Sequence, residues 1–317
     1  MNPRIISISI LMFCVTFSTL FAGGYSEAKL CKELKEGYNI STFPLAQTTA
    51  SLNYVFIAED LIIRAGLKSG EALAEYNLRT KETNSISSPV EWNGRRVGPI
   101  DDLYYDDTTN TLHVRIKERL PTNDTTTLFF LLHLDDGSWE EIPELKGLIY
   151  QCAYLPENHL LYIVPMHGED ILVFNMDTRE FTEQINMIEK TTQVYTMYGN
   201  PLHILGRIWN ENEFQYYIFD TSTLTGKVFS NTDFISEEGS FEYYVYIDSQ
   251  RFLCLNRLKQ YESEVMELDL EAGTQRVVAL ESFPRELFYL KKVDETHYSF
   301  LTRTDDNWLV LCIMEYY

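Results

Sequence analysis

The chain has 317 residues, a length that allows one large domain or two ordinary ones. Hydrophobic residues make up 45% and charged residues 23%, which is typical of a globular protein with a core and excludes a disordered chain. The formal net charge of -21, from 26 basic and 47 acidic residues, repels nucleic acid and anionic lipid headgroups, so we expect no nucleic-acid partner.

The N-terminus has the pattern of an export signal. A positive residue, Arg4, precedes an apolar run over residues 5–21 and small residues at 22–24. We therefore predict a signal peptide over residues 1–24 and an extracytoplasmic location, which is periplasmic, at the cell surface or secreted. Two alternatives stay open: cleavage after Ala28, or an uncleaved membrane anchor, because the apolar run is near the lower limit for spanning a bilayer. The anchor would be the protein's one link to a membrane.

A short pattern recurs along the rest of the chain: an apolar residue, then Asn, His or Asp, then usually an apolar residue and a polar turn. The central residues of its six copies are Asn77, His133, Asn175, Asp220, Asp269 and, in a degenerate copy, Ile313. Successive copies lie 56, 42, 45, 49 and 44 residues apart. A period of about 45 residues is typical of the four-stranded blades of β-propellers.

Six strand–turn–strand segments lie between these copies, bounded by the residues that turns require. They begin at Tyr54, Leu103, Ala153, Tyr195, Tyr243 and Leu287. Together the two series predict six blades, near residues 51–97, 98–147, 148–192, 193–239, 240–285 and 286–317.

The last blade has only three strands, and an open sheet edge is a liability. Tyr38 to Phe43 has strand character, so we expect it to pair with the strand through Cys312 and close the ring. The predicted fold class is thus all-β, a six-bladed β-propeller over residues 25–317 closed by an N-terminal strand. A disulfide bridge from Cys31 to Cys312 would lock this closure, and we keep it as a hypothesis.

This organisation resembles the six-bladed propellers of exported bacterial proteins, such as the Tol-system and NHL-like groups. The resemblance covers nearly all of the mature chain and concerns architecture only. The Gly-Asn-rich NHL consensus and the Trp-Asp dipeptide of WD repeats are both missing. The resemblance therefore implies a shape and transfers no functional residues.

The sequence contains no nucleophile elbow, phosphate loop, zinc-protease motif or calcium loop. No two histidines have metal-ligand spacing, so we predict neither metal nor cofactor. The Asn and Asp residues of the repeat are expected to hydrogen-bond the turn that follows them. We interpret the acidic pairs as solvated turns; they are Glu59-Asp60, Asp101-Asp102, Asp106-Asp107, Asp135-Asp136, Glu169-Asp170, Asp294-Glu295 and Asp305-Asp306.

One feature suggests a binding site: the second strand of every blade except the third ends in arginine. These residues are Arg64, Arg115, Arg207, Arg257 and Arg303. Turns after the second and fourth strands of each blade share one face of a propeller, so the arginines should lie toward one rim, with Trp92, Trp209 and Trp308 in loops on the same face. Arg and Trp can grip a carboxylate, a sugar or a partner's side chain. The alternative is that the arginines pair with nearby acids such as Glu211, Glu262 and Asp305.

The expected function is an exported scaffold in the cell envelope that binds a protein or a small anionic or sugar ligand, through the five arginines, Trp209 and Trp308. The alternative is a sugar-acting or lactone-acting enzyme with its site at the mouth of the central channel. Whether the protein is an enzyme stays open, with binding favoured. Acidic or histidine side chains converging on the channel mouth would favour an enzyme, and an apolar or arginine-lined mouth would favour a binder.

Overall fold

The computed structural model describes residues 26–48, 52–66, 73–86, 91–92, 95–96, 100–119, 125–147, 151–164, 170–187, 191–199, 201–210, 213–229, 240–258 and 262–317. The predicted signal peptide, residues 1–24, lies outside these ranges. Within the part of the chain that is described, no helix combines the length and apolar character needed to cross a membrane.

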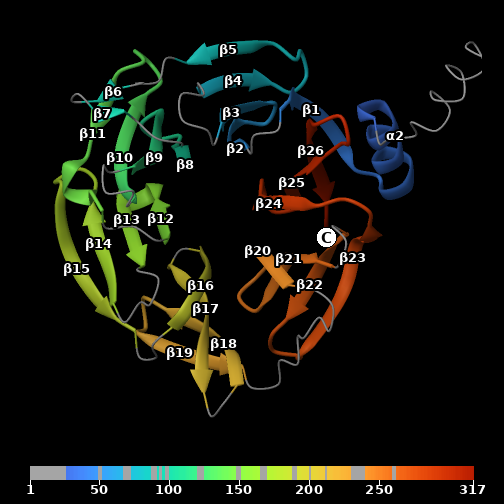
Figure 1. The fold of residues 1–317 in the computed structure, drawn as a ribbon. Helices are drawn as coiled ribbons and strands as arrows, with labels where there is room; N and C mark the ends of the chain where they lie inside the picture. The colour runs from blue at the N-terminus through green and yellow to red at the C-terminus, as the bar shows by residue number, and fades with distance from the viewer. Residues whose placement is uncertain are drawn as a thin grey trace, which may run out of the picture.

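Six four-stranded antiparallel sheets surround a common centre, and this arrangement confirms the predicted six-bladed propeller (Figure 1). From the inside outward, blade one is β2 (Leu52–Ala58), β3 (Leu61–Gly66), β4 (Leu73–Asn77) and β5 (Thr83–Ile86). A small pair, β6 (Glu91–Trp92) and β7 (Arg95–Arg96), follows it. Blade two is β8 (Ile100–Asp106), β9 (Thr111–Arg119), β10 (Thr125–His133) and β11 (Trp139–Glu141), followed by the short helix η1 (Pro143–Leu145).

The next three blades repeat this order. Blade three is β12 (Gln151–Leu155), β13 (Leu160–Val164), β14 (Asp170–Asn175) and β15 (Glu180–Asn186), with the short helix η2 (Pro156–Asn158) in its first turn. Blade four is β16 (Thr191–Tyr198), β17 (His203–Asn210), β18 (Glu213–Asp220) and β19 (Thr225–Phe229). Blade five is β20 (Ser240–Tyr246), β21 (Arg251–Arg257), β22 (Ser263–Asp269) and β23 (Thr274–Phe283).

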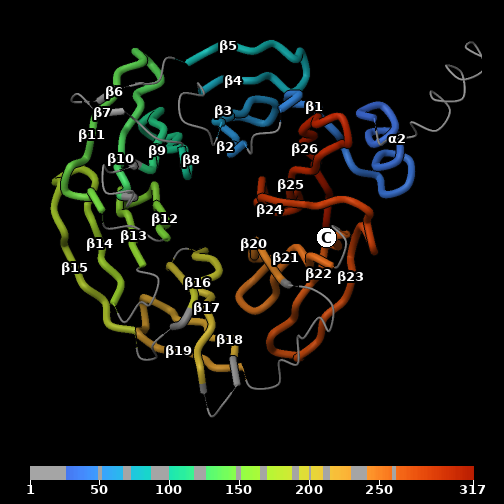
Figure 2. The backbone as a smooth tube through the Cα atoms, in the orientation of Figure 1, coloured from blue at the N-terminus to red at the C-terminus, as the bar shows by residue number. Residues whose placement is uncertain are grey.

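Blade six joins the two ends of the ring. Its strands are β24 (Leu287–Lys292), β25 (His297–Arg303), β26 (Trp308–Glu315) and, outermost, β1 (Ser41–Gln47). β1 pairs antiparallel with β26, from Ser41 opposite Ile313 to Gln47 opposite Trp308. The blue and red ends of the tube lie together at this sheet (Figure 2). Closure by an N-terminal strand is confirmed.

The closing strand begins at Ser41, however, and not at the predicted Tyr38. Tyr38 is the last residue of helix α2 (Glu27–Tyr38), which ends because Asn39 takes the left-handed conformation, at φ 55°. The side chain of Ser26 caps the start of the helix. Leu30 and Leu34 are fully buried against the outer part of blades five and six.

The core is divided into six apolar clusters, one in each junction between neighbouring blades, including the junction of blade six with blade one. Cys152, Cys254 and Cys312 are buried and Cys31 is half-buried, and all four are free thiols. The hypothetical bridge from Cys31 to Cys312 is therefore not formed.

Two faces of the ring differ in their turns. The turns after the first and third strands of the blades lie on one face, which we call the acid face. There the repeat residues close the turns as expected: Asn77 Oδ1 accepts hydrogen bonds from the backbone amides of Arg79 and Thr80, at 2.9 and 2.8 Å. Asn175, Asp220 and Asp269 make the same kind of turn contact. The opposite face carries the turns after the second and fourth strands, toward which the five arginines were predicted to lie, and we call it the arginine face.

Candidate functional site

The innermost strands of all six blades wall a cavity of about 580 Å³ in the central channel. Its lining is mostly polar and aromatic. The residues come from β2 (Asn53), β8 (Asp101, Asp102, Tyr104), β9 (Arg115), β12 (Gln151, Cys152, Ala153, Tyr154), β16 (Tyr195, Thr196, Met197), β20 (Tyr243) and β24 (Tyr289, Lys291).

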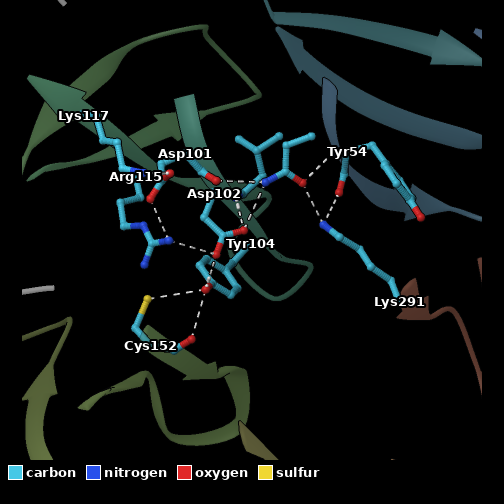
Figure 3. A network of polar contacts seen from close by, with 10 residues as sticks. Tyr54, Asp101, Asp102, Tyr104, Arg115, Lys117, Cys152 and Lys291 are labelled. Atoms are coloured by element: carbon cyan, nitrogen blue, oxygen red, sulfur yellow. Dashed lines mark hydrogen bonds and ion pairs between the residues drawn. The ribbon is translucent and has the colours of Figure 1, made fainter. Parts of the chain in front are cut away.

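A network of charged groups forms one wall of this cavity (Figure 3). The guanidinium of Arg115 lies 2.8 Å from Asp101 Oδ2 and 3.5 Å from Asp102 Oδ2. The other oxygen of Asp101 lies 2.6 Å from the amine of Lys117. The hydroxyl of Tyr104 donates to Asp102 Oδ2 at 2.7 Å and lies 3.0 Å from the carbonyl oxygen of Cys152 in blade three. These carboxylates are thus already neutralised by cations of their own blade.

The network continues across two further blade junctions. Asn53 of blade one donates from Nδ2 to the backbone oxygen of Asp101, at 3.1 Å, and to Asp102 Oδ1, at 3.3 Å. The amine of Lys291 of blade six donates to Asn53 Oδ1, at 2.9 Å, and to the backbone oxygen of Tyr54, at 2.5 Å (Figure 3). Four blades are therefore linked through polar side chains that face the channel.

Burial shifts the pKa values of three groups in this wall. Desolvation lowers the pKa of Lys291, and Asp102 opposes this shift only in part. For Arg115, burial works against the charge, but Tyr104 and Asp102 outweigh it and raise the pKa further. Burial also raises the pKa of the Cys152 thiol to about 11, so this cysteine is protonated and a poor nucleophile at neutral pH.

The opposite wall is built from tyrosines held in irregular strands. Tyr195, Tyr243 and Tyr289 each lie in a bulge of the first strand of a blade, where the pairing register shifts. Tyr243 and Tyr289 have positive φ, 54° and 57°, which is rare for a bulky residue and costs of order 1–3 kcal/mol. Their rings meet edge to face at 5.5 Å. Strain of this kind concentrates at functional sites, where the surrounding structure sustains it.

Of the seven residues that the sequence singled out as ligand contacts, Arg115 lines the described cavity. It is buried and ion-paired within its own blade. Arg64 donates to the backbone oxygen of Leu45 in β1, and Arg257 pairs with Glu242 and Glu286. The strands place the five arginines toward the arginine face, but in separate blades.

The predicted tryptophans lie in strands and not in loops. Trp209 belongs to β17 and is 55% exposed, and Trp308 begins β26 opposite Gln47. Trp92 belongs to β6. Arg207 lies in β17 beside Tyr195, and Arg303 ends β25. Of the acids suggested as their partners, Asp305 pairs with Arg285, and Glu211 lies outside the described residues.

No protein-family model matches the chain, and no curated protein matches it. Solved structures do. The tricorn protease is similar with a TM-score of 0.53 and 14% identity, over 82% of this chain and 26% of that one. An oligogalacturonate lyase in complex with manganese has a TM-score of 0.51 and 14% identity, over 81% and 74%. TolB from Acinetobacter baumannii has a TM-score of 0.48 and 12% identity, over 90% and 68%. Likeness at such identity shows the propeller fold alone.

Most of this site was not predicted from the sequence. The pair Asp101-Asp102 was interpreted as a solvated turn, whereas both residues lie in β8, half-buried, and line the cavity. One feature of the sequence could have indicated their true position. The pair comes directly before Leu103, at the start of the first strand of a blade, whereas a turn would follow the end of that strand. Lys291 likewise lies inside a strand, the first strand of blade six. Across the described residues, no three His, Cys, Asp or Glu side chains are grouped so that they could hold a metal ion.

Proposed function

We propose that this protein is an exported binding scaffold that holds a small neutral ligand rich in hydroxyl groups, such as a sugar, in the central channel. The observation that carries the proposal is the cavity of about 580 Å³ walled by all six blades. That volume lies in the range of about 300–1,000 Å³ that ligand sites occupy. Export rests on the signal pattern in residues 1–24.

The chemistry of the lining favours such a ligand. The lining carries two carboxylates, Asp101 and Asp102, and two cations, Arg115 and Lys291, and Lys117 also pairs with Asp101, so a ligand with a large net charge would meet at most one excess charge. Tyrosine rings offer flat surfaces for the C–H faces of a sugar ring, and their hydroxyls accept or donate hydrogen bonds. Gln151 adds a buried side-chain oxygen that has no hydrogen-bond partner among the described residues.

Titration calorimetry with a panel of compounds tests this proposal. The panel contains the neutral sugars cellobiose, maltotriose and chitobiose, together with galacturonic acid and citrate as anionic probes. We expect at least one neutral sugar to bind saturably with a Kd below about 1 mM, and the anions to bind more weakly. Citrate binding tighter than every sugar, or no saturable binding in the panel, would overturn the neutral-ligand assignment.

A pair of variants then tests where the sugar binds. Tyr243→Asn removes a channel ring, and Asn tolerates the positive φ at this position. Tyr38→Asn is the matched control, because Tyr38 is also 37% exposed and also has one edge-on aromatic neighbour, Phe283. We expect affinity to fall at least fivefold in Tyr243→Asn and to stay unchanged in Tyr38→Asn. Equal affinities in all three proteins would place binding outside the channel.

That Arg64, Arg207, Arg257, Arg303, Trp209 and Trp308 contact a ligand on the arginine face stays a prediction. The enzyme alternative is tested on the same samples by chromatography of the sugar after incubation. New products that disappear with Lys291→Met would show that the channel carries out a reaction, with Lys291 as the group tested because burial lowers its pKa.

A further inference from the structure

A second cavity, of about 730 Å³, opens on the acid face at the seam between blades six and one. It shares no lining residue with the channel cavity. Its walls come from β1, β2, β8, β25 and β26 and from the turns beside them. The closing strand therefore contributes directly to this cavity, through Ser41 and Phe43.

The floor of the cavity is apolar. Phe43, Phe56 and Ile313 are half-buried side chains at the edge of the core between blades six and one. Ile57 and Tyr105 occupy the same position at the edge of the next core, between blades one and two. Two apolar cores thus meet the solvent at this point, and covering them would remove apolar surface from water.

The rim of the cavity is acidic. It carries Glu59, Asp60, Asp107 and Asp294. Asp60 pairs with Arg79 at 2.5 Å, and Asp294 lies 2.8 Å from the ring of His297. Glu59 and Asp107 are exposed. Low-dielectric walls below such a rim strengthen its negative field.

Beyond the rim, the neighbouring turns of the same face carry ion pairs. Asp248, in the first turn of blade five, lies 2.7 Å from the guanidinium of Arg251, and Glu295, in that of blade six, lies 3.1 Å from the amine of Lys292. Glu59 and Asp107 are therefore the acids left to attract a cation at this cavity. A segment with one apolar residue in the cavity and basic residues on either side would contact both the floor and these two acids.

We propose that this cavity is the docking site for a basic segment of a partner protein, which inserts one aromatic side chain between Phe43, Phe56 and Ile313. Lys or Arg residues flanking that side chain lie against Glu59 and Asp107. A net charge of -21 attracts such a partner over a distance of about a Debye length and makes association dependent on salt.

The experiment uses fluorescence anisotropy of the labelled peptide Lys-Ser-Lys-Trp-Lys-Ser-Lys with the whole protein. Two other labelled peptides are compared with it: one has Ser in place of Trp, and the other has Glu in place of every Lys. We expect saturable binding of the first peptide, binding at least fivefold weaker without Trp, and none with Glu. Equal binding with and without Trp would overturn the proposal, because charge alone would then explain it.

Three variants locate the bound peptide. The pair Glu59→Gln and Asp107→Asn removes two charges from the rim, and Ala58→Trp fills the cavity from an exposed lining position. The control pair, Glu180→Gln and Glu183→Gln, removes the same charge from exposed positions on β15 in blade three. We expect the first pair and Ala58→Trp each to weaken binding at least fivefold, and the control pair to leave it within twofold. Circular dichroism verifies that each variant is folded.

Equal losses in the rim pair and the control pair, or full binding by Ala58→Trp, would overturn the site. The channel proposal is independent of this result, because sugar binding in the same variants is measured separately. A protein that binds sugar but no peptide would retain the proposed function and lose the docking site.

Discussion

His113 lies on β9 in the junction between blades two and three, with 2% of its surface exposed. Its ring packs on Tyr154, with the centroids 4.1 Å apart. Burial lowers the pKa of His113 to about 4; the nearby Asp106 opposes the shift, and the cations Arg179 and His159 add to it. The imidazole is therefore neutral in the folded protein at physiological pH.

This burial predicts a loss of stability in mild acid. The unfolded chain protonates His113 near pH 6.5, whereas the folded protein does so only near pH 4, so the unfolded state binds the extra proton between these values. The free energy of unfolding should fall as pH drops from about 6.5 to about 4, by about 2.5 kcal/mol at pH 4.5 on the one-group relation. We expect His113→Gln to remove this part of the slope.

Urea unfolding at pH 7.5 and pH 4.5 measures the effect. His133→Gln is the matched control, because the ring of His133, in the same blade, is 40% exposed and lies 3.6 Å from Glu140. The acid-induced loss of stability should be smaller in His113→Gln than in the wild type and in His133→Gln. The assignment is wrong if all three proteins lose the same free energy between the two pH values.

Single residues also show why the site could be predicted only in part from the sequence. Asp101 and Asp102 resemble every other acidic pair of the chain, and only the pairing of β8 with β9 brings them to Arg115. Ion pairing of the arginines with nearby acids was kept as an alternative, but Asp101 and Asp102 were not among the acids named as partners of Arg115. Pairing between strands decides which side chains lie beside Arg115, and spacing along the sequence does not encode that pairing.

At the scale of elements, β1 is the closing strand. Leu45 is 4% exposed and belongs to the core between blades six and one, and Ser41 on the same strand is exposed. Leu45→Ala should destabilise the protein by about 2–4 kcal/mol, the usual effect of a buried Leu→Ala change. Ser41→Ala should stay within about 0.5 kcal/mol of the wild type.

Urea unfolding followed by circular dichroism and by tryptophan fluorescence tests whether closure is shared by the whole ring. Both signals of Leu45→Ala should move together to a lower midpoint in one transition. If the two signals give different urea midpoints for Leu45→Ala, or if its midpoint equals that of Ser41→Ala, then β1 stabilises only its own blade and not the whole ring.

The turns of the blades were the most predictable elements, because Asn or Asp at a fixed place in each repeat closes the turn locally. The closing strand was less predictable. Tyr38 to Phe43 has strand character, yet a helix cap at Asn39 ends α2 there and shifts β1 to Ser41. A short apolar stretch does not reveal on which side of such a boundary it lies.

At the scale of the whole molecule, the net charge of -21 should oppose folding, since like charges are closer in the compact state. Raising NaCl from 10 to 300 mM screens exposed charges, whereas the partly buried pair of Arg115 with Asp101 is screened less. We therefore expect the urea midpoint to rise with NaCl. A midpoint that falls would show that surface ion pairs outweigh the repulsion.

The sequence determines the architecture well, since the period of about 45 residues predicted six blades and the structure has six four-stranded sheets. The residues that line the channel could not be predicted in the same way. Bulges at Tyr195, Tyr243 and Tyr289 interrupt the alternation of inward and outward side chains, and thereby turn tyrosines toward the centre. No period in the sequence marks a bulge, so the cavity could be known only from the fold.

The pairing of β1 with β26 has a consequence for how the protein is made. The ribosome synthesises β1 before every other strand of the ring and β26 after every other strand. Until β26 emerges, β1 has an unpaired edge and the junction between blades six and one has only one side, so the nascent chain is open to strand exchange with its neighbours. Moving β1 to follow β26 in a circular permutant would make blade six one continuous hairpin series, and would allow it to form without waiting for the rest of the ring.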